Sequence, residues 1–213
     1  MPTSNPLITD SVLQAAAWLN SGQLLAYPTE SVWGIGCDPF DKVAVEQLLS
    51  IKQRPIEKGM IVVTDSAERV KPLLASLDGK QRDIILDSWQ PQLTLKTWQA
   101  QTWLLPINKT LDIAIPSWIT GEHNSVAVRV IAHPLIKQLC AQLVSADNPY
   151  GFLVSTSCNP SSLPPAISLE QAQDYFLHAG INLDRQVGYL RGQTLSYELP
   201  SQISDAITGQ IIR

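Results

Sequence analysis

The spacing of apolar residues along the chain predicts strands that alternate with helices. Continuous apolar runs predict buried strands, and they fall at residues 23–27, 60–64, 125–131 and 151–155. Apolar residues spaced three or four apart predict helices, and these fall at residues 11–20, 42–51, 66–77, 80–89, 135–143 and 168–179. This order favours an α/β fold. Residues 186–213 look like a meander of short strands with turns at Gly192 and Gly209, so the predicted sheet is mixed.

Local signals fix several of the predicted boundaries. Asp10 or Ser11 can cap the first helix, Asp41 can cap the second, and Pro134 suits the first turn of a later one. The strand at 23–27, the helix after Asp41 and the strand at 60–64 together predict a βαβ unit with two parallel strands.

Composition restricts the classes of protein that remain. The chain has 213 residues, 45% of them hydrophobic, and shows no repeat or clear linker, so we expect one domain over residues 1–213. Fifteen basic and 19 acidic residues give a net charge of −4, which argues against a protein that mainly coats nucleic acid.

Location is predicted from what the sequence does not contain. The N-terminus lacks the order of a signal peptide, and no apolar run approaches the roughly 20 residues that span a bilayer. Cys37, Cys140 and Cys158 are far apart and suggest neither a disulfide framework nor a zinc site. We expect a cytoplasmic protein with no membrane partner and with cysteines that act as small buried hydrophobes.

Two polar segments are candidates for chemistry. Lys52, Arg54 and Lys58 form a cationic cluster that suits phosphate, although basic residues at a helix end also complement its dipole. Ser157 and Asn159 follow a strand, where α/β proteins bind ligands, although Ser and Asn are also common in ordinary turns.

A third candidate lies around the strand at residues 125–131. Arg129 sits among apolar residues and must find a partner, either the carboxylate of a bound amino acid or a structural carboxylate such as Glu30. Thr29 and Ser31 flank Glu30 and offer two hydroxyls, or form no more than a capped turn. No phosphate-binding or dinucleotide glycine motif occurs, and the three histidines show no metal spacing, so we assign no catalytic acid or base and no metal ligand.

These segments together resemble the YrdC/TsaC family of threonylcarbamoyl-AMP synthases. The resemblance rests on four segments in the order that the family has them: Tyr27-Pro28-Thr29-Glu30-Ser31-Val32-Trp33-Gly34, Lys52-Gln53-Arg54-Pro55, Ser125 to Pro134, and Ser155-Thr156-Ser157-Cys158-Asn159. Ser204 to Gly209 also resembles the tail of short bacterial members. The chain departs from the family where Trp89-Gln90-Pro91-Gln92 replaces Trp-Pro-Gly-Pro.

The resemblance implies a twisted mixed sheet with flanking helices around a concave cleft. It implies that the protein converts ATP, L-threonine and bicarbonate to threonylcarbamoyl-AMP and pyrophosphate, with Mg²⁺ accompanying the ATP. This product serves the t6A modification of ANN-decoding tRNAs, and tRNA is reached through other proteins of that pathway. The implied ATP ligands are Lys52, Arg54, Lys58, Thr94, Ser157 and Asn159. The implied threonine ligands are Thr29, Ser31 and Arg129.

Two other functions stay open at this stage. One is a module that binds tRNA or double-stranded RNA without adenylate synthesis, against which the net charge of −4 weighs. The other is a domain that passes a carbamoyl-adenylate to the maturation of a metal centre, although such domains normally sit in much longer chains.

Overall fold

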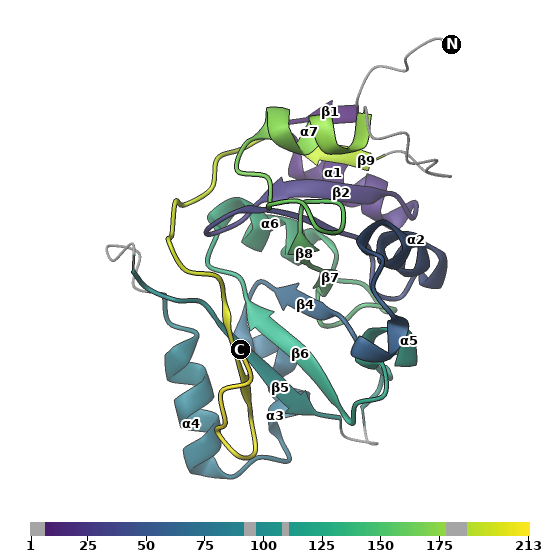
Figure 1. The fold of residues 1–213 in the computed structure, drawn as a ribbon. Helices are drawn as coiled ribbons and strands as arrows, with labels where there is room; N and C mark the ends of the chain where they lie inside the picture. Colours follow the sequence, from purple (N-terminus) through teal and green to yellow (C-terminus); the bar gives the residue numbers. More distant parts are fainter. Residues whose placement is uncertain (1–6, 92–96, 108–110, 178–186) are drawn as a thin grey trace.

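The fold consists of two five-stranded mixed sheets with helices packed around them (Figure 1). The structure is a computed structural model that describes residues 7–91, 97–107, 111–177 and 187–213. The α/β prediction is confirmed, but the predicted single sheet is replaced by two, which Figure 1 shows one above the other.

The first sheet, sheet A, contains both parallel and antiparallel pairs. Its strands lie in the order β1 (Leu7–Thr9), β9 (Val187–Leu190), β2 (Leu24–Pro28), β3 (Trp33–Gly36) and β8 (Thr156–Ser157). The first three are parallel, and β3 runs antiparallel to both β2 and β8. The segment after Pro28 therefore turns back on β2 as a β-hairpin.

The second sheet, sheet B, is also mixed. Its strands lie in the order β10 (Gln202–Asp205), β5 (Gln101–Pro106), β6 (Ser125–Val130), β4 (Ile61–Thr64) and β7 (Leu153–Val154). β10 is parallel to β5 and β6 is parallel to β4, while the other pairs are antiparallel.

The helices begin where the sequence signals place them. Ser11 caps the first through Gln14 N–H (3.3 Å), Asp41 caps the second through Ala44 N–H (3.1 Å), and Pro134 opens the sixth. The α-helices are α1 (Val12–Asn20), α2 (Lys42–Lys52), α3 (Lys71–Leu74), α4 (Gly79–Ser88), α5 (Ser117–Thr120), α6 (Pro134–Gln142) and α7 (Leu169–Leu177). The 3₁₀ turns are η1 (Ile56–Lys58) and η2 (Ala67–Val70), so the helix predicted at residues 66–77 is broken into η2 and α3.

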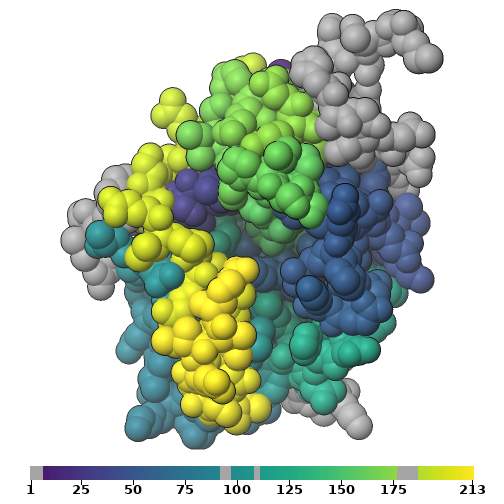
Figure 2. Space-filling model, in the orientation of Figure 1, coloured from purple at the N-terminus to yellow at the C-terminus, as the bar shows by residue number. Residues whose placement is uncertain are grey.

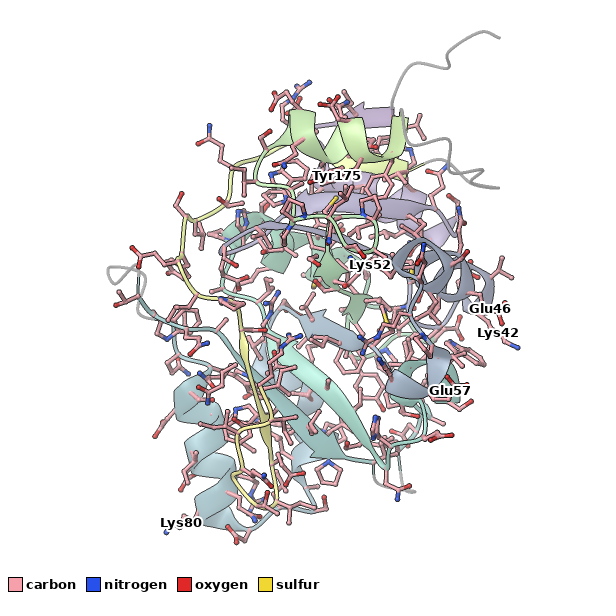
Figure 3. All side chains as sticks on the ribbon, in the orientation of Figure 1. Lys42, Glu46, Lys52, Glu57, Lys80 and Tyr175 are labelled. Atoms are coloured by element: carbon pink, nitrogen blue, oxygen red, sulfur yellow. The ribbon has the colours of Figure 1, made fainter. Side chains whose placement is uncertain are left out.

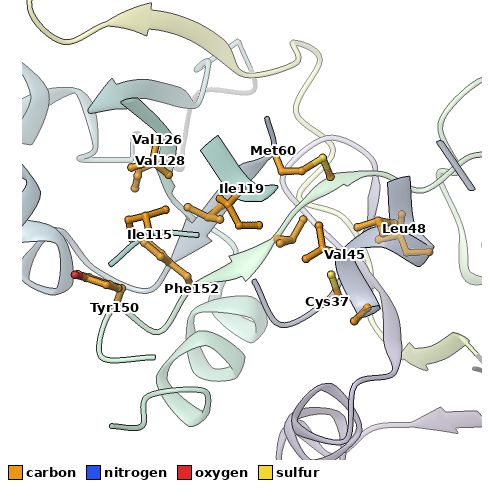
Figure 4. Packing of buried hydrophobic residues seen from close by; sticks show 14 of the residues in the cluster. Cys37, Val45, Leu48, Met60, Ile115, Ile119, Val126, Val128, Tyr150 and Phe152 are labelled. Carbon is orange, nitrogen blue, oxygen red and sulfur yellow. The ribbon is translucent and has the colours of Figure 1, made fainter. Parts of the chain in front are cut away.

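Buried side chains from both sheets and the helices between them form the core. One cluster joins α2 to sheet B and contains Val45, Met60, Val128 and Phe152 (Figure 4). The free cysteines are buried, as expected of small hydrophobes.

The predicted βαβ unit is wrong. β2 belongs to sheet A and β4 to sheet B, so the two strands are not neighbours. Their apolar runs predicted burial correctly, but burial does not specify which strand lies alongside. The predicted C-terminal meander is wrong for the same reason, because β9 is inserted into sheet A and β10 joins sheet B.

The chain passes from sheet B to sheet A at residues 153–157. β7 pairs with β4, Ser155 N–H donates to Ile61 O (2.9 Å), and β8 then pairs with β3. Gly36 allows this close approach, since a Cβ there would lie 1.8 Å from Val154 O. The crossing brings the polar loop after β8 beside the end of α2.

Candidate functional site

Lys52, the last residue of α2, lies against the loop that follows β8. Its Nζ donates to Ser157 O (2.9 Å), Asn159 O (2.8 Å) and Asn159 Oδ1 (2.8 Å), and Ser157 Oγ lies 3.4 Å away. Lys52 is partly buried and lies near the middle of the view in Figure 3, whereas Lys42 of the same helix is at its outer edge. Three predicted ligands, 105 and 107 residues apart in sequence, therefore form one cluster.

Burial changes the acidity of this lysine. Desolvation lowers the pKa of Lys52 to about 8, and the nearby Arg54 charge acts in the same direction. At neutral pH most molecules still carry the ammonium, which the surrounding oxygens stabilise. A cation held beside a solvent-accessible loop is suited to a phosphate group.

Arg54 and Lys58 are placed differently from Lys52. The Arg54 guanidinium donates from Nε to Gly59 O (3.0 Å) and from Nη2 to Lys58 O (3.1 Å), which fixes it against the turn after η1. Burial lowers the pKa of Arg54, and the positive charge of Arg213 adds to this effect. Lys58 contributes its carbonyl to the turn, and its residue is exposed. Both residues are exposed, and the two hydrogen bonds hold the Arg54 guanidinium in place.

The turn between β2 and β3 carries the predicted threonine-binding hydroxyls. Thr29 is buried, and both its N–H (3.1 Å) and its Oγ1 (2.7 Å) donate to Val32 O. Ser31 is only partly buried. The capped turn foreseen as the simpler alternative is therefore present, and a binding role for these hydroxyls stays a prediction.

Arg129 of β6 faces Glu30 from this turn. Its Nη2 lies 3.6 Å from Glu30 Oε2, and the two side chains are 12% and 3% exposed. Glu30 Oε1 accepts a hydrogen bond from Ala132 N–H (2.7 Å), which links the end of β2 to the segment after β6. Of the two partners considered for Arg129, the structure provides the carboxylate of Glu30.

Sheet A connects two groups of site residues: the Lys52 cluster (Lys52, Ser157 and Asn159) and the Arg129 cluster (Thr29, Glu30 and Arg129). Gly34 pairs with Tyr27 on one side and with Ser157 on the other, and a Cβ on Gly34 would lie 3.1 Å from the Thr29 methyl group. The Thr29 turn therefore lies two strands from the loop that holds Lys52.

A C-terminal segment, residues 193–197, crosses the Thr29–Glu30 turn, and sequence reasoning missed it. Leu195 N–H donates to Thr29 O (3.2 Å) and Tyr197 N–H donates to Glu30 O (3.0 Å). The ring of His133, the residue that precedes α6, makes a hydrogen bond from Nε2 to Gln193 O (2.9 Å). The yellow C-terminal part of the chain continues over this face in Figures 1 and 2. Backbone contacts of this kind leave no side-chain pattern that would have revealed them.

The remaining predictions for the site concern Thr94, metals and membranes. Thr94 lies outside the described residues. Within the described ranges, no group of three or more His, Cys, Asp or Glu side chains converges as a metal site would require. None of the helices described here has the length and apolar content of a bilayer crossing.

Comparison with known sequences gives matches over the entire chain. The family described as Sua5_yciO_yrdC, telomere recombination, matches residues 17–213. Proteins named threonylcarbamoyl-AMP synthase from Psychrobacter cryohalolentis and Psychrobacter arcticus are 68% and 69% identical over 214 residues, which is 100% of each chain. The protein of that name from Acinetobacter baylyi is 46% identical over 97% of this chain and 98% of its own.

Solved structures share the fold. E. coli YciO superposes with a TM-score of 0.71 at 19% identity, over 97% of this chain and 92% of its own. P. abyssi Sua5 complexed with L-threonine superposes with a TM-score of 0.72 at 22% identity, over 95% of this chain and 54% of its own. This chain therefore spans about half of that longer protein.

Proposed function

The chain belongs to the Sua5/YciO/YrdC family, and we propose that it synthesises threonylcarbamoyl-AMP and pyrophosphate from L-threonine, bicarbonate and ATP. The observation that carries the proposal is the 68% identity, over the full length of both chains, to a threonylcarbamoyl-AMP synthase. The product would supply the t6A modification of tRNAs that read ANN codons, with tRNA reached through other proteins.

The arrangement of the site supports this chemistry. The threonine amine forms a new N–C bond with carbon from bicarbonate, and water is lost. A carbamate oxygen then attacks the α-phosphorus, the bond between that phosphorus and the bridging oxygen to the β-phosphate breaks, and pyrophosphate leaves. The protein has to hold two anionic reactants together and neutralise charge, which cations and amides do without a catalytic histidine.

Each cluster has a proposed part in that reaction. Lys52 and Arg54 neutralise the phosphates, and Ser157 and Asn159 contact the nucleotide on the loop that Lys52 holds. Lys58 adds charge at the surface, and Thr94 is proposed as a further nucleotide contact. On the other side of Gly34, the three proposed threonine ligands are Thr29, Ser31 and Arg129.

Mg²⁺ belongs to this proposal as part of the substrate. The donors around Lys52 are carbonyl, amide and hydroxyl oxygens, and no carboxylate cage converges within the described ranges. Such a site fits an ion that arrives on the phosphates of ATP and keeps several waters. The protein then binds the magnesium–ATP complex through its phosphates.

The test is pyrophosphate release that depends on both threonine and bicarbonate. We expect Lys52→Ala to lower this activity at least about a hundredfold, because a cation and the loop it holds are lost together. Lys42→Ala is the matched control, since Lys42 lies at the other end of α2 in an exposed pair with Glu46 (3.6 Å) and should retain activity within about twofold.

Two results would contradict the proposal. One is pyrophosphate release that continues without threonine, and the other is no release under any combination of the three reactants. RNA binding that persists in the Lys52→Ala protein would indicate a separate surface and would not account for the site.

A further inference from the structure

Glu30 and Arg129 form a buried pair whose contact is incomplete. Their closest approach is 3.6 Å, which is too long for a hydrogen bond. Among the described residues, neither Glu30 Oε2 nor Arg129 Nε has a hydrogen-bond partner, and the same holds for the hydroxyl of Thr102. Thr102 pairs with Arg129 across β5 and β6, so its side chain lies on the same face.

Such a pair is costly to keep. A buried carboxylate needs compensation from charge and hydrogen bonds, and a buried polar atom without a hydrogen-bond partner destabilises the folded state. Glu30 is nevertheless 3% exposed and fixed from behind, because its Oε1 accepts the Ala132 N–H at 2.7 Å. The position of its second oxygen is therefore set by the backbone and not by Arg129.

The orientation of the guanidinium follows from this anchor. Nε and Nη2 form one edge of the group: Nη2 lies nearest to Glu30, and Nε is buried. A ligand must therefore approach the opposite end of the guanidinium. The long distance leaves room for Arg129 to adjust without losing its counter-charge.

Charge balance also favours an amino acid. The carboxylate of Glu30 and the guanidinium of Arg129 sum to zero, so a zwitterion can bind there without adding net charge to a buried site. Without Glu30, the isolated cation would be costly to bury and free to turn toward solvent.

We propose that Glu30 is a positioning residue that holds Arg129 with one end presented to the carboxylate of L-threonine. The inference rests on the proposed function only for the identity of the amino acid. Glu30 itself touches backbone and Arg129, and its effect on threonine passes through the guanidinium.

The test measures the binding of L-threonine and of ATP separately, by titration calorimetry. Glu30→Gln keeps an oxygen for Ala132 N–H but turns an amide donor toward Arg129, so we expect threonine affinity to fall at least about tenfold and ATP affinity to stay within about twofold. Glu30→Asp restores the charge on a shorter side chain and should recover part of the threonine affinity.

The matched control is Asp65→Asn. Asp65 pairs with Arg69 at 3.3 Å outside the two clusters, so the variant loses one carboxylate from an Asp–Arg pair and should leave both affinities within about twofold. A thermal melt of each variant establishes that it is folded. If Glu30→Gln does not fold, threonine and ATP affinities are compared in Glu30→Asp instead.

Three results would overturn the inference: unchanged threonine affinity in folded Glu30→Gln, an equal fall in the affinities for threonine and ATP, or a native protein that does not bind threonine. A native protein that binds threonine but releases no pyrophosphate would refute the proposed function and leave the positioning role intact.

Discussion

Raising the pH through the pKa of Lys52 is expected to weaken ATP binding. The pKa of this lysine is lowered to about 8, mainly by burial, so it loses its proton within the range in which most proteins remain folded. Below that pH the ammonium is present and can bind phosphate. Above it the group is neutral, so affinity declines as the pH rises.

The size of the effect follows from the pKa. One unit above it, at about pH 9, only about a tenth of the molecules keep the charge, so the dissociation constant for ATP should rise about tenfold if only the charged form binds. An unperturbed lysine, with a pKa of about 10.4, would produce almost no change over that interval. The displaced pKa therefore predicts a measurable decline where a surface lysine would not.

The assay is the dissociation constant for ATP, measured from about pH 7.5 to about pH 9.5 without threonine, whose own amine titrates in this range. Lys52→Arg keeps its charge throughout and should show a flat profile. The Lys52→Met variant should bind ATP weakly at every pH in this range. A flat profile in the native protein, or an equal decline in the arginine variant, would refute the assignment of Lys52 to the phosphates.

Two further predictions concern cations and close packing. Arg54→Ala should raise the KM for ATP about tenfold or more and Lys58→Ala less than about threefold, because two hydrogen bonds fix the Arg54 guanidinium, although both residues are exposed. Equal or reversed effects would contradict this order. Gly36→Ala should lower the free energy of unfolding by about 3 kcal/mol, since its Cβ would lie 1.8 Å from Val154 O. Gly79→Ala at the start of α4 meets no atom within 4 Å and should stabilise slightly, so denaturant melts of the two variants should shift in opposite directions.

The helices could be predicted because their signals are local. Asp41, Ser11 and Pro134 start helices where the sequence places them, since a cap or a proline acts within one turn. The apolar runs also predicted strands, and β2 and β4 are buried on both faces as expected, whereas β6 alternates buried and partly buried residues.

Strand partners could not be predicted in the same way. β3 lies outside the strands that the apolar runs predict, because two of its four residues are glycines, yet Gly34 pairs on both sides and Gly36 lies against the backbone of β7. Whether β4 lies next to β2 or next to β6 depends on contacts between residues far apart in sequence. An apolar run carries no information about that choice.

The site shows the same division. The contact between Lys52 and Asn159 joins residues 107 apart in sequence, so no spacing rule indicates it. Only the family resemblance assigned both residues to one site. Arg129 was different, because a charge in an apolar strand requires a partner, and Glu30 was one of two proposed. The hydrogen bonds from Leu195 and Tyr197 use backbone groups, which every sequence provides.

The place of β9 in sheet A has a consequence for how the protein is made. β9 (Val187–Leu190) lies between β1 (Leu7–Thr9) and β2 (Leu24–Pro28), so these two strands leave the ribosome long before the strand that pairs with both of them. Until then each presents an unpaired edge to other nascent chains. Formation of this sheet therefore waits for β9 and depends on closing a very long loop.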